Sequence, residues 1–202
     1  MGDGLEPDDE RLVSLSKDGS LDAFNSLVER HQAAVYTLCL RLLGHPQSAE
    51  DAAQEAFLSA YRAISRFQGG NVRSWLLRIA ANESKDELRR RNRKDTAGSL
   101  TQIFDNQELP IEVRDPAEPI EQRIERQELG AQIQIALLAL PFDQRQAVVL
   151  SDLYGYHYSE IVEITGSTPG TVKSRIHRGR ERLAKILAAH PELSDRPRRS
   201  KE

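Results

Sequence analysis

Apolar side chains recur at helical spacing along most of this 202-residue chain, and this periodicity constrains the fold more than any other feature. Within residues 20–44 the helical spacing is met by Leu21, Phe24, Leu27, Val28, Val35, Leu38 and Leu42. No Asn-Gly or Asp-Gly pair separates two alternating apolar runs, so the usual signal for a β-hairpin is missing. The sequence therefore predicts an all-α fold.

Long helices are expected in the first half of the chain, at about 20–43, 49–66 and 73–94. Ser20 or Asp22 can begin the first helix. Ser48, with Asp51 three residues later, resembles a capping box for the second. The third helix ends in RRRNRK, where five cations in six positions exceed what the helix dipole favours.

The texture of the sequence changes after residue 94, which indicates two small helical domains. Residues 95–128 hold nine acids, three arginines and three prolines without sustained periodicity, as expected of a flexible acidic linker. A short helix can start near Pro119. The expected organisation is a first domain at 1–94, a linker at 95–130, a second domain at 131–190 and a polar tail at 191–202.

Composition argues against several classes of protein. No apolar run approaches the roughly 18 residues of a membrane span, and the acidic start MGDGLEPDDE lacks the apolar core of a secretory signal, so a cytoplasmic location is expected. Cys39 is the single cysteine and lies in the apolar run VYTLCLRLL, which favours a buried structural thiol. No spacing of ligands indicates a metal or cofactor site, and no nucleophile–base pair or phosphate loop indicates an enzyme.

A basic segment near the end of the chain contrasts with the net charge of −3. From Lys173 to Lys185 it holds six Lys/Arg and one acid. The basic segment lies in a helix that Ser167 or Thr168 can cap. A short helix at about 159–165 and a turn at Gly166 come before it, which is the pattern of a helix-turn-helix. A charge run alone can be a solvated helix face, but this context favours a recognition helix that enters the major groove of DNA.

Helical geometry separates an inner and an outer face of this second helix. With Val172, Ile176 and Gly179 turned inward, the outer face offers small residues, hydroxyls and cations. The candidates for contacting bases or phosphates are Gly170, Thr171, Lys173, Ser174, Arg175, His177 and Arg178. The cations expected along the phosphate backbone are Arg180, Arg182 and Lys185.

Both halves of the chain resemble the same protein family. The segment LPFDQRQAVVLSDLYGYHYSEIVEITGSTPGTVKSRIHRGRERL is similar to region 4 of the extracytoplasmic-function (ECF) sigma factors of bacterial RNA polymerase. The segments AEDAAQEAFLSAYRAISRF and SWLLRIAANESKDELRRRNR resemble the polymerase-binding and promoter-melting helices of region 2. The resemblance implies a protein that binds core RNA polymerase and directs initiation at chosen promoters, with the −35 element read by the basic helix.

The resemblance also implies roles for residues of the first domain. Asp51, Gln54 and Glu55 are implied to contact the clamp coiled coil of the large polymerase subunit, although acids near a helix start also suit the dipole. The residues implied to open the −10 element and capture a base are Phe67, Asn71, Trp75, Arg78, Asn82 and Lys85. Such capture needs a stacking surface and polar groups. The only tryptophan of the chain is also typical of core packing.

The remaining expectations concern partners. The acidic linker resembles the segment that threads through positively charged polymerase channels. The free protein is expected to be a monomer, in which the domains fold against each other or an anti-sigma factor lies between them. A conventional helix-turn-helix regulator is the alternative, and it predicts a dimer that binds duplex DNA without polymerase.

Overall fold

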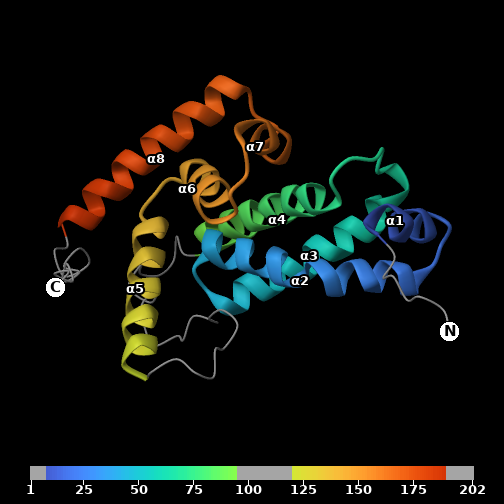
Figure 1. Cartoon of the computed structure of the whole chain (residues 1–202), viewed down its shortest axis with the longest axis horizontal. Coiled ribbons are helices and arrows are strands. Elements are labelled where there is room, and N and C mark those ends of the chain that lie inside the picture. The colour runs from blue at the N-terminus through green and yellow to red at the C-terminus, as the bar shows by residue number, and fades with distance from the viewer. Residues whose placement is uncertain (1–7, 95–119, 190–202) are drawn as a thin grey trace, which may run out of the picture.

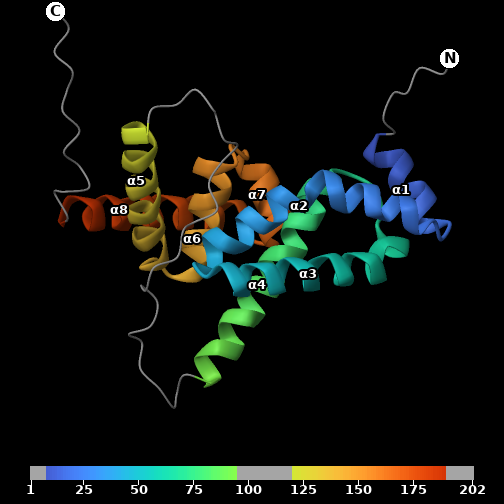
Figure 2. The same ribbon diagram turned by 90° about the horizontal axis from the view of Figure 1, so that it is seen from below.

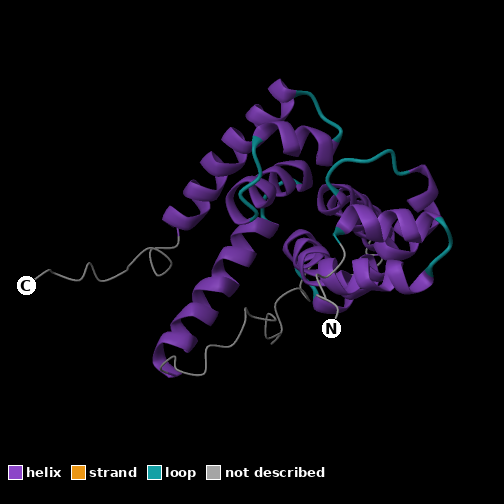
Figure 3. Ribbon diagram, turned by 45° about the vertical axis from the view of Figure 1, so that its right-hand side comes forward, coloured by secondary structure: helices purple, strands orange, loops and turns teal. Residues whose placement is uncertain are grey.

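Helices make up all the regular structure in the described part of the chain (Figure 3). The computed structural model describes residues 8–94 and 120–189. Its elements are α1 (Asp9–Lys17), α2 (Leu21–Leu43), α3 (Pro46–Ala63), the 3-10 turn η1 (Ile64–Arg66), α4 (Val72–Lys94), α5 (Ile120–Leu138), α6 (Phe142–Val148), the π-helical turn η4 (Val149–Leu153), α7 (Tyr158–Thr165) and α8 (Pro169–Ala189). The all-α prediction is confirmed, and α1 is a helix that the sequence patterns did not indicate.

The first domain packs α1 to α4 around a shared core. The helices α2, α3 and α4 each contact the other two, and α1 packs on α2. Alanines on the inner face of α3, including Ala52, Ala56 and Ala60, allow its neighbours to approach closely. Cys39 is fully buried beside the carbonyl of Ala80, and burial raises the pKa of its thiol to about 11. This environment supports the interpretation of Cys39 as a structural residue.

The ends of these helices follow the sequence signals with one exception. Ser20 caps α2 by accepting a backbone hydrogen bond, and Gly44 ends it in the left-handed conformation with φ of 73°. The expectation that Ser48 begins the next helix is wrong. His45 caps α3 by accepting a hydrogen bond from the Ser48 N–H, and Pro46 is its first residue. Proline suits that position because its missing N–H would have no partner within the helix.

The second domain consists of α5 to α8, with α8 packed on α6. Val172 and Ile176 are buried on the inner face of α8, as the sequence predicts. Gly179 lies where α8 meets α6. A Cβ atom there would come within 2.6 Å of Val148 Cγ2 and 3.3 Å of the Gln144 carbonyl oxygen. The contact between these two helices therefore requires a residue without a side chain.

The two domains pack directly against each other, and their buried side chains form one continuous core. Helix α7 lies against α4, and α5 lies against α2 (Figure 1). Gln134 Nε2 donates to the carbonyls of Leu40 and Arg41, at 3.4 and 3.2 Å. Arg145 Nη1 donates to the carbonyl of Leu42. The carbonyls of Arg41 and Leu42, in the last turn of α2 where a helix leaves acceptors without partners, are therefore satisfied by the other domain.

The expected linker and tail fall mostly outside the described residues. These are residues 95–119 of the linker and 191–202 of the tail. The short helix expected near Pro119 is the 19-residue helix α5, which begins at Ile120. The expected linker boundary at residue 130 therefore lies inside a helix. Within 8–94 and 120–189, no helix combines the length and the apolar character needed to cross a membrane.

Replacing Gly179 by Ala should lower the free energy of unfolding by about 1–3 kcal/mol, because the new methyl group overpacks the contact between α8 and α6. Urea or thermal denaturation measures the change. Gly170→Ala is the matched control, since a Cβ atom at Gly170 meets nothing within 4 Å. An equal loss of stability in both variants would show that close packing is not the reason for glycine at position 179.

Candidate nucleic-acid interface

A threonine caps the N-terminus of α8, the second helix of the helix-turn-helix. Thr168 Oγ1 accepts a hydrogen bond from the Thr171 N–H at 3.3 Å, so Thr168 rather than Ser167 is the cap. Gly166 turns the chain between α7 and α8 in the left-handed conformation, with φ of 62°. The turn at Gly166 and the contact between α7 and α8 together set the direction of α8 relative to α7.

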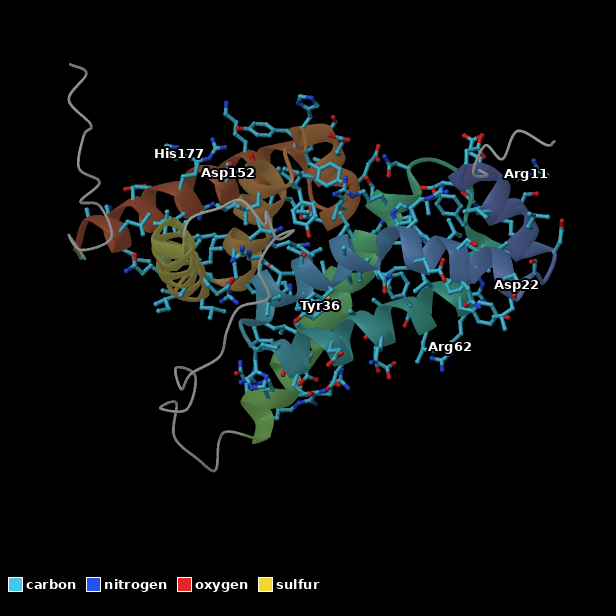
Figure 4. All side chains as sticks on the ribbon, turned by 60° about the horizontal axis from the view of Figure 1, so that its bottom comes forward. Arg11, Asp22, Tyr36, Arg62, Asp152 and His177 are labelled. Atoms are coloured by element: carbon cyan, nitrogen blue, oxygen red, sulfur yellow. The ribbon has the colours of Figure 1, made fainter. Side chains whose placement is uncertain are left out.

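The outer face of α8 carries the residues expected to read the −35 element. Gly170, Lys173, His177 and Arg178 are exposed, and Thr171, Ser174 and Arg175 are half-buried. Figure 4 shows His177 projecting outward from α8. Arg178 folds back onto Ser174, donating to its carbonyl at 3.3 Å and its hydroxyl at 3.0 Å. Among the described residues, no group of three or more His, Cys, Asp or Glu is arranged to hold a metal ion.

Part of the basic run serves the fold of the second domain. Arg180 Nη2 pairs with Asp152 Oδ1 at 2.5 Å and also donates to Ser151 Oγ. The hydrogen bond from Arg180 is the main reason that the pKa of Asp152 is lowered. Lys185 pairs with Glu181 one turn away at 2.8 Å. Arg180 and Lys185, expected along the phosphate backbone, therefore already have acidic partners within their own domain.

A pocket of about 380 Å³ opens at the start of α4. Its lining residues are Arg66, Phe67, Gln68, Gly69, Gly70, Asn71, Ser74, Trp75, Arg78 and Glu163. The rings of Phe67 and Trp75 form an aromatic wall, with centroids 4.9 Å apart. Asn71 Oδ1 accepts a hydrogen bond from the Ser74 N–H at 2.9 Å and so caps α4. Four of the six residues expected at the −10 element thus meet in one pocket, where Trp75 serves both the core and the wall.

The other two candidates, Asn82 and Lys85, lie outside the pocket but on the same face of α4. Their spacing from Trp75 and Arg78 places all four in one stripe along the helix. Asn82 is exposed. Lys85 is half-buried, with Nζ 2.9 Å from Asp143 Oδ1. Beyond this stripe, the basic C-terminal end of α4 projects from the body of the molecule (Figure 2).

One carboxylate, that of Asp143 in α6, joins the two predicted DNA-binding faces. Lys85 of the first domain pairs with Oδ1, and Arg175 of α8 pairs with Oδ2 at 2.8 Å. Partial burial acts to raise the pKa of Asp143, but the Lys85 hydrogen bond and the nearby cations outweigh it, and the pKa is lowered. The stabilisation of the folded chain by the ionised Asp143 carboxylate is therefore complete above the usual pKa of aspartate, about 4. It is lost only as the pH falls through the lower pKa of the folded state.

Asp143 was not among the residues that the sequence indicated. It follows Pro141 in the first turn of a helix, where an acid is ordinary because it faces the positive end of the dipole. The pairing with Lys85 spans 58 positions and carries no local signal.

The residues expected to contact polymerase share one exposed face of α3. Asp51, Gln54 and Glu55 are all exposed. Leu58 and Tyr61 continue the same face with exposed fractions of 48% and 43%, which is high for large apolar side chains. Leu58 was not identified from the sequence as a contact residue, although its position four residues after Gln54 places it on the same helix face.

Models of known protein families match both domains. The model described as Sigma-70 region 2 matches residues 27–94, and the model described as Sigma-70, region 4 matches residues 131–183. These ranges contain α3, α4 and most of α2 in the first domain, and α6, α7 and most of α8 in the second.

Curated relatives align over most of the chain. The ECF RNA polymerase sigma factor SigE of Mycolicibacterium smegmatis is 39% identical over 193 residues, covering 93% of this chain and 72% of the relative. The ECF RNA polymerase sigma factor SigW of Bacillus subtilis is 37% identical over 189 residues, covering 88% of this chain and 96% of the relative.

Solved structures show the same arrangement of helices. The sigma factor RpoE of Bartonella quintana, solved with the anti-sigma factor NepR, has a TM-score of 0.62 and 25% identity, with 84% of this chain and 99% of that chain covered. CnrH in complex with the cytosolic domain of CnrY has a TM-score of 0.65 at 24% identity, with 90% and 98% covered, and supports the fold. With both sigma regions matched and such relatives aligned over most of its length, the chain belongs to the ECF sigma factors of the sigma-70 family, DNA-binding proteins without enzymatic activity that direct promoter-specific transcription initiation by RNA polymerase.

Proposed function

We propose that this sigma factor uses three separate faces for three tasks. The exposed face of α3 around Asp51, Gln54 and Glu55 binds the clamp of core polymerase, with Leu58 and Tyr61 as an apolar contribution. The pocket and stripe of α4 open the −10 element and hold one base. The outer face of α8 reads the −35 element, and the protein acts in the cytoplasm with core polymerase.

The observation that carries this assignment is the face of α4. An aromatic pocket large enough for a nucleobase continues into a stripe of Arg78, Asn82 and Lys85. Stacking a base on Phe67 and Trp75 would offset the few kcal/mol, roughly, that unstacking it from the duplex costs. A regulator that only binds duplex DNA through α8 has no use for such a face.

We further propose that promoter reading requires the two domains to separate. In the docked arrangement two acids of the second domain reach the α4 face: Asp143 pairs with Lys85, and Glu163 lines the base pocket. The DNA-binding face of α4 is consequently engaged while the domains remain together, whereas the outer face of α8 stays largely exposed. Core polymerase would hold them apart, with the acidic linker in its channel. An anti-sigma factor, of the kind seen with the Bartonella relative, would keep the chain away from polymerase.

Mixing the protein with sigma-free core polymerase and following both by size-exclusion chromatography tests the assignment of α3. The free protein should elute as a monomer and the mixture as a complex. Asp51→Arg combined with Glu55→Arg should abolish co-elution, because two exposed acids are replaced by cations. Asp22→Arg with Glu29→Arg, also exposed, is the control for charge. A stable dimer that ignores polymerase would contradict the proposal and favour the conventional regulator.

Lys173→Ala and Arg178→Ala should each change −35 recognition without affecting polymerase binding. Promoters are first recovered from randomised DNA by run-off transcription with the holoenzyme, and the recovery is repeated with each variant. A lost base contact costs about 1–3 kcal/mol and relaxes one position, whereas a lost phosphate contact lowers the salt dependence by about one unit. Arg11→Ala on α1 is the control for loss of charge. Unchanged promoter choice and salt dependence would show that the reading face lies elsewhere.

Asp143→Asn should raise the fraction of free molecules with separated domains by roughly 1.5- to fivefold, because the partly exposed Lys85–Asp143 ion pair between the domains is lost. Single-molecule fluorescence transfer between dyes on Arg62→Cys in α3 and Ala188→Cys in α8 measures this fraction. Asp152→Asn is the matched control, since its partner Arg180 lies in the same domain. An equal fraction in both variants would exclude Asp143 as the link between the domains.

A further inference from the structure

The N-terminal helix α1 lies outside the family match, which begins at residue 27, yet it is firmly attached to the first domain. Leu12 and Val13 are buried, and contacts run to α2 and to η1. Asp9 pairs with Arg30 at 2.7 Å and with His31 at 2.8 Å. The far end of α1 is consequently held at a fixed place beside the base pocket.

The last residue of α1, Lys17, contacts the residue from which the pocket loop departs. Its Nζ donates a hydrogen bond to the Phe67 carbonyl at 2.5 Å and lies 5.9 Å from the centroid of the Phe67 ring. Phe67 follows η1 as its C-terminal cap residue, and its ring packs against Trp75 at an interplanar angle of 47°. A single ammonium group therefore holds both the carbonyl and the ring of the pocket wall.

The loop itself has few other restraints. Gly69 and Gly70 adopt φ values of 97° and 99°, and a Cβ atom at either would meet nothing within 4 Å. Within the described ranges, Gln68, Gly69 and Gly70 form no hydrogen bond. The loop is thus fixed only at its ends, by Phe67 and by the cap at Asn71. Losing one fixed end would allow the pocket to change shape before a base enters it.

We infer that Lys17 is a positioning residue for promoter opening, and this inference rests on the proposed role of the pocket in base capture. The α1 helix carries the ammonium group, the ammonium group orients Phe67, and Phe67 presents its ring to the flipped base. A wall that is already ordered does not lose conformational freedom when the base stacks on it, so capture becomes more favourable. The residue acts through Phe67 and does not touch the base.

The experiment uses full-length protein in holoenzyme with a promoter recovered from randomised DNA as above. Lys17→Met removes the ammonium group and keeps a side chain of similar length, whereas Lys17→Arg keeps a cationic donor. Arg11→Ala removes a cation from the same helix, whose side chain Figure 4 shows projecting into solvent. Arg78→Ala changes an exposed residue of the pocket itself. Opening is followed through the permanganate reactivity of unpaired thymines, alongside affinity for core polymerase and for the closed promoter.

Lys17→Met should slow opening roughly three- to tenfold, the range expected for one lost hydrogen bond, with unchanged affinity for core polymerase and for the closed promoter. Lys17→Arg should restore most of the rate, and Arg11→Ala should leave it unchanged. A defect that Lys17→Arg does not restore, or that Arg11→Ala reproduces, would overturn the inference. If Arg78→Ala slows opening and Lys17→Met does not, only the role of Lys17 fails. If neither does, the pocket assignment fails with it.

Discussion

The C-terminal end of α2 is the point on which the arrangement of the two domains depends. Its last carbonyls face the second domain, and Gln134 and Arg145 supply the donors they need. Arg145 also donates to the carbonyls of Leu138 and Leu140, so one guanidinium joins α2 to the turn between α5 and α6. Burial lowers its pKa to about 10, which leaves it charged at neutral pH. Because a buried cation is costly without its partners, loss of these acceptor carbonyls would destabilise the junction between the domains.

Helices with long apolar stripes could be predicted from the sequence, whereas those that depend on neighbours could not. Both α2 and α4 are 23 residues long, and their periodicity is visible in the sequence. At nine residues, α1 is shorter than helices that are stable alone, and Leu12 and Val13 become buried only against the rest of the domain. The start of α3 was placed too late because His45 competes with Ser48 as a cap, and propensity favours serine.

In the candidate site, too, residues close together in the sequence could be predicted, whereas those with distant partners could not. Phe67, Asn71, Trp75 and Arg78 lie within twelve positions of one another, so their pattern could be recognised before their contacts were known. Asp143 and Lys17 reach partners 58 and 50 positions away, and nothing in their immediate neighbours indicates this. Sequence patterns reveal which side chains a helix offers to DNA. Only the packed structure shows which of these side chains are held by another part of the chain.

Asp143 acts as an internal counterion for two cations that are predicted to contact DNA. Lys85 and Arg175 share the single negative charge of Asp143 before any nucleic acid is present. Added salt screens the partly exposed Lys85–Asp143 pair between the domains and so favours the separated form, but it weakens the binding of the freed Lys85 to phosphates. The two effects oppose each other in the free protein and not in the holoenzyme, where we propose that the domains are held apart. Added salt is therefore expected only to weaken DNA binding by the assembled initiation complex. In the free sigma factor it is expected both to favour domain separation and to weaken phosphate binding.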